Sequence, residues 1–163
     1  PNLTLKHDTE GNTTAELSKA YTKGSRLYAV QQIKFSIAPG ADSEQFSLRR
    51  LICPASGDTC TGEGDELVEG IENMQVLFGE DREANDDGTD GDGTANRYVP
   101  FDDPTLRMDR VVSVRIFLLA RSLNDNLTTE SSPYFFYDQV HAPGDKRLRK
   151  AFTTTITLRN KSS

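Results

Sequence analysis

The sequence predicts a protein of the α+β class that is mostly β and is built around an antiparallel sheet. Several segments alternate apolar and polar residues with a period of two, which is typical of strands with one buried face. These segments follow one another without the spacing of strand–helix–strand units, which favours hairpins over parallel pairing. Little of the sequence has the apolar period of a helix, so a small helical fraction is expected.

Length and composition indicate a single domain over residues 1–163. The hydrophobic content is 35% and the mean hydropathy is −0.59, so polar loops are expected to be numerous. No run of residues approaches the roughly 18 apolar positions of a membrane-spanning helix, and no signal peptide is recognisable. The chain begins at Pro1 without a methionine, and we expect it to be a processed or excised piece.

The first part of the chain predicts a hairpin. A weak pattern at residues 16–24 suggests a short helical turn. Residues 25–38 predict a strand, because apolar and polar side chains alternate from Ile33 to Ile37. A Pro-Gly turn follows at residues 39–42, and residues 46–52 are expected to form the returning strand.

Two cysteines, Cys53 and Cys60, enclose a loop that contains proline and glycine. Two cysteines that close such a loop favour a disulfide and therefore an oxidising compartment. The alternatives are a pair of free thiols and an incomplete metal site. Zinc lacks obvious further ligands, because both histidines, His7 and His141, are remote in sequence.

Residues 66–78 predict a strand that enters the core. Its Met74, Val76 and Phe78 share one face, and we interpret this stripe as core packing. Residues 96–99 are expected to re-enter the same sheet after an acidic loop.

The C-terminal third predicts two more strands. The most apolar stretch, residues 110–122, is expected to be a central strand. Residues 123–144 predict a long irregular segment. The alternatives for its aromatic run SSPYFFYD are a partner surface and packing onto the sheet, and packing is favoured. The basic run DKRLRK at residues 145–150 is interpreted as a solvated turn. Residues 152–159 predict a final strand that is exposed on one face.

A sheet with one apolar face needs a cover, and this sequence offers little helix to provide it. We therefore expect that a missing N-terminal helix, or a partner protein, packs against the sheet.

The loop between the strands at residues 66–78 and 96–99 is strongly acidic. Seven carboxylates and one arginine, Arg82, occur between Glu80 and Asp92. Carboxylates packed so closely repel one another, and they stay solvated unless a cation binds among them. The run Asp-Gly-Asp-Gly-Thr-Ala-Asn from Asp90 places oxygens at alternate positions with glycines at the turns, as short calcium-binding loops do.

Four segments together resemble PilW-type minor pilins of type IV pili: ELVEGIENMQVLFG, TDGDGTANRYV, RVVSVRIFLLARS and RKAFTTTITLRN. The segment GSRLYAVQQIKFSI is similar to the strand that opens the globular part of those proteins. The resemblance runs in order from about Gly24 to Asn160. The sequence is similar, more distantly, to the J-type minor pseudopilins of type II secretion.

The resemblance implies a structural subunit that helps to nucleate and cap a type IV pilus. Such proteins lie in the bacterial inner membrane and periplasm before assembly and then in the pilus at the cell surface. The implied partners are other minor pilins, the major pilin and a tip adhesin. The family carries a long hydrophobic N-terminal helix, which this chain lacks and which would supply both the membrane contact and the missing cover.

The family's acidic loop commonly reads Asp-Thr-Asp-Gly-Asp-Gly, and here Gly88 occupies its first position. In a frame that starts at Gly88, the twelfth position is Val99 instead of a bidentate glutamate, so a full EF-hand is excluded. A partial calcium site, with Asp102 or Asp103 as extra ligands, and an acidic loop without metal are the two interpretations. The candidate calcium ligands are Asp86, Asp87, Asp90, Asp92, Thr94 and Asn96.

Catalytic function finds no support in the sequence. There is no GxSxG, HExxH, P-loop or dinucleotide-binding motif. Nucleic-acid binding is not expected at a sequence pI of about 4.9. We therefore predict a non-enzymatic pilus subunit; the alternatives are a type II secretion pseudopilin and a calcium-dependent adhesion or carbohydrate-binding module.

Overall fold

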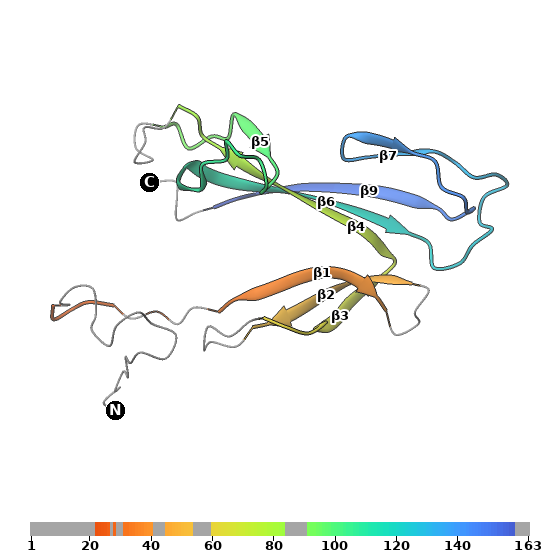
Figure 1. Ribbon diagram of the computed structural model, residues 1–163, viewed down its shortest axis with the longest axis horizontal. Helices are drawn as coiled ribbons and strands as arrows, with labels where there is room; N and C mark the ends of the chain where they lie inside the picture. Colours follow the sequence, from red (N-terminus) through yellow and green to blue (C-terminus); the bar gives the residue numbers. More distant parts are fainter. Residues whose placement is uncertain are drawn as a thin grey trace.

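The computed structural model describes residues 22–26, 28, 31–40, 45–53, 60–83 and 91–158. In these residues the chain forms three antiparallel sheets and one short 3-10 helix, η1 (Met108–Arg110) (Figure 1). The mostly β, antiparallel fold class predicted from the sequence is therefore confirmed. No described helix has the length and apolar character needed to cross a bilayer.

A three-stranded sheet has the order β1–β2–β3, with β1 (Ile33–Pro39), β2 (Phe46–Ile52) and β3 (Asp65–Glu69). The predicted hairpin is confirmed as β1 and β2, although β1 begins at Ile33 and not at residue 25. The described residues before Ile33 lack the apolar–polar alternation, and Tyr28 is 71% exposed. The register pairs Ile33 with Ile52, so the apolar side chains of both strands share one face.

Gly70 separates two strands where the sequence pattern predicts a single one. The chain on its two sides forms β3 and β4 (Ile71–Glu80), which belong to different sheets. Gly70 has φ +75°, and a Cβ there would lie 2.7 Å from the carbonyl oxygen of Arg121. Its N–H donates to the Phe46 carbonyl and its own carbonyl accepts from the Arg121 N–H. A left-handed glycine bonded on both sides therefore turns the corner between the two sheets.

The four-stranded sheet has the order β5–β4–β6–β9. Its members are β4, β5 (Arg97–Val99), β6 (Val111–Arg121) and β9 (Arg149–Thr157). β6 is central, as predicted, and β5 is the predicted re-entry after the acidic loop. The register pairs Met74 with Leu118 and Val76 with Ile116, which gathers apolar side chains on one face.

β9 lies at the edge of the four-stranded sheet. It begins three residues earlier than predicted, at Arg149, and it was expected to be exposed on one face only. Every residue from Lys150 to Thr157 is exposed, because β6 is the only strand beside it in the described part of the chain.

A small hairpin of β7 (Tyr134–Phe136) and β8 (Gln139–His141) was not predicted. In Figure 1 it lies on one side of the four-stranded sheet, and the three-stranded sheet lies on the other. Phe136 is 2% exposed, and the ring of Tyr137 meets that of Phe117 edge-on, with centroids 5.4 Å apart. The expectation that this aromatic run packs onto the sheet is therefore confirmed.

Cys53 and Cys60 form a disulfide, as the sequence favoured, with Cα atoms 5.1 Å apart. There are no free cysteines, so the alternatives of free thiols and of a cysteine metal site are excluded. The disulfide joins the end of β2 to the segment that leads into β3.

Candidate functional site

The four-stranded sheet leaves one apolar face half open. This face is opposite the β7–β8 hairpin, because side chains alternate along each strand and the hairpin lies over Phe117. Its central side chains, predicted to be core, are only half-buried. Towards the edge, Phe152 and Ile156 are 49% and 50% exposed. The other apolar members of this face are Met74, Val76, Phe78, Val114, Ile116 and Leu118.

The three-stranded sheet also carries exposed apolar side chains on one face. Phe35, Ile52 and Val68 are each 50% exposed, and the register of β1, β2 and β3 places them on the same side. Large apolar side chains that are half exposed in a contiguous group are typical of surfaces that another chain covers.

The base of the acidic loop is buried, which corrects the expectation that all its carboxylates stay solvated. Glu80 and Asp81 are 2% and 1% exposed. Glu80 Oε1 accepts from the Arg107 N–H at 2.7 Å, and its Oε2 lies 3.4 Å from Arg97 Nη1. Asp81 accepts from the backbone N–H groups of Glu83 and Gly93, at 3.1 and 2.8 Å. Glu80 is the last residue of β4 and Asp81 follows it, and together they close the base of the loop.

The six predicted calcium ligands fall partly outside the described residues: Asp86, Asp87 and Asp90 lie there. Within the described part, Asp92 Oδ1 accepts from the Thr94 N–H at 2.8 Å, and Asn96 Oδ1 accepts from the Arg82 N–H at 2.7 Å. No cluster of three or more histidine, cysteine or acidic side chains that could hold a metal ion occurs among the described residues.

Of the two extra calcium ligands considered, Asp103 is already engaged. Its carboxylate accepts from the hydroxyl and the N–H of Thr105, at 2.7 and 2.8 Å, and from Arg97 at 2.7 Å. The hydrogen bonds from Thr105, followed by the charge and hydrogen bond of Arg97, lower the pKa of Asp103 below its ordinary value. This carboxylate braces the segment after β5.

The basic run at residues 145–150 is not a simple solvated turn. The side chain of Arg149 is 5% exposed and forms ion pairs with Glu72 on β4 and with Asp145. The hydrogen bonds from Arg149 lower the pKa of Asp145 to about 2. Arg147 donates to the carbonyl oxygens of Ser122 and Leu123. The basic side chains therefore hold β9, β4 and the end of β6 together.

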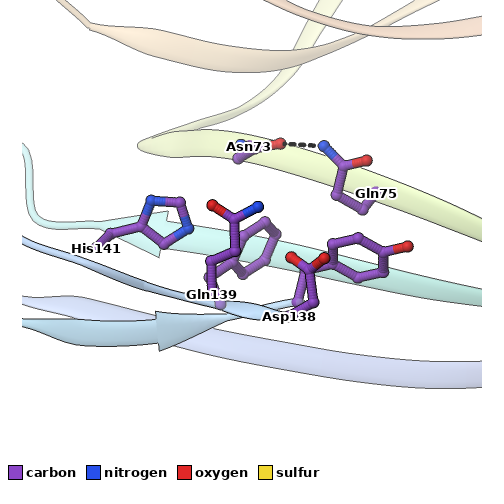
Figure 2. A pocket seen from close by; sticks show the side chains of 7 residues that line it. Asn73, Gln75, Asp138, Gln139 and His141 are labelled. Carbon is purple, nitrogen blue, oxygen red and sulfur yellow. Dashed lines mark hydrogen bonds between the residues drawn. The ribbon is translucent and has the colours of Figure 1, made fainter.

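A pocket of about 120 Å³ lies between β4 and the β7–β8 hairpin (Figure 2). Asn73 and Gln75 line it from β4, where Gln75 Nε2 donates to Asn73 Oδ1 at 3.1 Å. Figure 2 shows the side chain of Gln139 between those of His141 and Asp138, across from these two amides. Phe136 and Tyr137 complete the lining. The sequence does not indicate this site, because its residues come from two distant segments with no shared motif.

Two sheets with half-open apolar faces, and an edge strand with one neighbouring strand in the described part of the chain, define a mostly β domain suited to association with other chains. A family model described as PilW, type IV pilus-assembly protein W, matches residues 34–160. The chain belongs to this family. Searches of curated proteins and of solved structures gave no significant match.

Membership of the PilW family indicates a role related to type IV pilus assembly. It also indicates interaction with other pilus components and an association with the pilus and the cell envelope. The family is generally non-enzymatic.

Proposed function

We propose that this chain is the globular domain of a minor pilin, a structural subunit of the type IV pilus tip or initiation complex. Its role is to promote pilus assembly through contacts with other minor pilins, the major pilin and a tip adhesin, and it catalyses no reaction. The observation that carries the proposal is the half-open apolar face on the sheet of a chain whose family acts in pilus assembly.

The apolar face is the surface where a hydrophobic helix docks. Phe152 and Ile156 expose about half of their side chains at its margin, beside the half-buried row on β6. Full burial of one such side chain contributes about 1.5–3 kcal/mol. The three-stranded sheet lies on the same side of the four-stranded sheet as this face (Figure 1), and a helix that docks along the exposed margin would cover several of these side chains at once.

The edge of β9 is the second contact surface. Its outer backbone groups can pair with an extended segment of a neighbouring subunit, which is a common mode of recognition. The two faces of β9 carry different side chains. Phe152 and Ile156 lie on one face, and Thr153 and Thr155 lie on the other. A partner strand is therefore expected to alternate apolar and hydroxyl-bearing side chains in the same order.

The test uses the full-length protein in cells that lack their own copy. Ile156→Lys places a charge on the apolar face, and we expect it to reduce the number of pili seen by electron microscopy at least tenfold. Val140→Lys is the matched control, because Val140 is 71% exposed on β8, away from that face. Wild-type piliation in both variants, at equal protein levels, would contradict the proposed function.

A second experiment tests whether the outer edge of β9 pairs with a neighbouring subunit. The globular domain is mixed with the purified globular domains of the other minor pilins, and co-purification is measured. We expect Thr153→Lys to weaken association, because a lysine on an edge strand disfavours further pairing. Thr129→Lys, at an exposed position in the segment between β6 and β7, should leave it unchanged. Failure of the wild-type domain to associate with any of them would count against the proposal.

A further inference from the structure

The pocket between β4 and the β7–β8 hairpin is lined mainly by side chains that both donate and accept hydrogen bonds. Three carboxamides, Asn73, Gln75 and Gln139, surround it together with the carboxylate of Asp138 and the imidazole of His141. Apart from the Asn73–Gln75 bond, these side chains make no hydrogen bond to another described residue. Their donors and acceptors therefore remain available to a ligand (Figure 2).

The chemistry of the lining selects a neutral, hydroxyl-rich ligand. A hydroxyl group both donates and accepts, so a carboxamide can bind two neighbouring hydroxyls with its oxygen and its nitrogen. Neither lysine nor arginine lines the pocket among the described residues, and Asp138 contributes a negative charge. An anionic ligand would therefore be repelled. The rings of Phe136 and Tyr137 offer apolar surface for the C–H face of a sugar ring.

The size of the pocket limits the ligand to one ring. A volume of about 120 Å³ is small beside the roughly 300–1,000 Å³ of pockets that enclose drug-sized ligands. A single pyranose would fill it with its outer edge in solvent, as the last residue of a glycan would.

The hairpin presents Tyr137 in a strained conformation. Tyr137 is the first residue of the two-residue turn between Phe136 and Gln139, and its φ is +60°. Glycine is favoured there, because a side chain is strained in this left-handed region. The conformation sets the Tyr137 ring against Phe117 at the wall of the pocket. Strain of this kind gathers at binding sites.

Ring and ion-pair contacts on Tyr134 support the β7–β8 hairpin. The Tyr134 ring stacks on the His141 ring at 5.2 Å, with an interplanar angle of 15°. The guanidinium of Arg149 lies 5.2 Å from the centroid of the Tyr134 ring and is fixed by Glu72 and Asp145. These contacts fix the orientation of the His141 ring in the pocket wall before a ligand binds, which lowers the entropic cost of binding.

We infer that this pocket binds one neutral sugar residue, such as the terminal pyranose of a glycan. The activity goes beyond the structural role, and it needs neither the apolar face nor the β9 edge. With one small ring and a few hydrogen bonds, affinity is expected to be weak, with a Kd of about 1 mM.

Protein-observed NMR of the isolated chain tests the inference. The probes are D-glucose, D-galactose, D-mannose and N-acetylglucosamine, each titrated to about 20 mM, with D-glucuronic acid as the anionic comparison. We expect at least one neutral sugar to shift the side-chain amide signals of Asn73, Gln75 and Gln139. Glucuronic acid should bind at least fivefold more weakly. Absence of such shifts with all four neutral sugars would overturn the inference.

Two variants separate binding from structure. Gln139→Ala should weaken sugar binding at least tenfold and leave the melting temperature within about 2 °C, whereas the exposed Gln31→Ala should bind as the wild type does. Tyr137→Gly relieves the turn and removes the ring, so the hairpin should remain folded while binding falls. Unchanged sugar affinity in both pocket variants would assign the shifts to another site and refute the inference.

Discussion

Arg149 and Glu72 lie 77 residues apart in the chain and are joined by two hydrogen bonds, Nε to Oε2 at 2.7 Å and Nη2 to Oε1 at 3.1 Å. The pair connects the edge strand β9 to β4 across the central strand β6. Because the Arg149 side chain is 5% exposed, its buried positive charge must be compensated, and Glu72 and Asp145 do so.

Arg149→Met should therefore destabilise the protein. The substitution leaves Glu72 and Asp145 without their main partner, and we expect the free energy of unfolding to fall by about 2–4 kcal/mol. Urea denaturation followed by circular dichroism measures it. Arg107→Met is the matched control, because the Arg107–Asp109 pair is about half exposed and contributes no more than about 1 kcal/mol. Equal losses in the two variants would contradict the assigned role of the Arg149 pairs.

Acid should remove part of the stability through Asp145. The pKa of this carboxyl is about 2 in the folded protein, below the ordinary 3.8, because the ionised form accepts hydrogen bonds from Arg149. The contribution is fully present above about pH 4 and is lost as the pH falls towards 2. Asp145→Asn should lower stability at pH 6 and flatten the dependence between pH 4 and 2. Parallel pH curves for variant and wild type would disprove the assignment.

Gly70→Ala should disrupt the junction between β3 and β4. An alanine there adopts a left-handed φ, at a cost of about 1–2 kcal/mol, and its Cβ would meet the Arg121 carbonyl oxygen at 2.7 Å. We expect a loss of at least about 2 kcal/mol, measured by chemical denaturation. Gly144→Ala is the control, because no atom lies within 4 Å of its added Cβ and its φ is not positive. A Gly70 variant as stable as this control would refute the strained-corner explanation.

Removal of the disulfide should lower stability moderately. The bond between Cys53 and Cys60 closes a short loop, with a sequence separation of 7. Loop-closure entropy for about eight residues gives about 2.5 kcal/mol, which corresponds to a fall in melting temperature of roughly 5–10 °C. The Cys53→Ala, Cys60→Ala double variant measures it by calorimetry. A reducing agent should shift the wild type by the same amount and should not affect the double variant.

Calcium binding by the acidic loop stays a prediction. For a Kd of about 0.1–1 mM, as in extracellular modules, 5 mM calcium should stabilise the protein by about 1–2 kcal/mol. Asp92→Asn should reduce this effect, since it removes charge and keeps the oxygen that accepts from Thr94. Thermal denaturation with calcium, magnesium or chelator checks both expectations. Identical melting curves with calcium and chelator would show that the loop binds no calcium in this range.

The strands could be predicted from the sequence because burial on one face of a sheet imposes a period of two. The alternation from Ile33 to Ile37 identified β1, and the apolar run on β6 identified the central strand. The half-open apolar face could be expected as well, since the sequence pairs an apolar sheet face with little helix.

Other features depend on contacts between distant segments and leave little local signal. Gly70 looks like an isolated glycine in a strand until its bonds to Phe46 and Arg121 are known. The β7–β8 turn was missed, because Tyr137 and Asp138 are not a usual hairpin turn pair. The burial of Glu80 depends on the Arg107 N–H and on the Arg97 side chain, both distant in sequence, so the acidic run alone does not indicate it.

The single-residue junction at Gly70 also has a mechanical consequence. β3 and β4 are joined there by one residue, and the same residue is hydrogen-bonded to β2 on one side and to β6 on the other. A force applied to one sheet is therefore transmitted to the other through Gly70, since no flexible loop lies between β3 and β4. Under tension along a filament, the load that passes along the chain from one sheet to the other would cross this residue, beside its hydrogen bonds to Phe46 and Arg121.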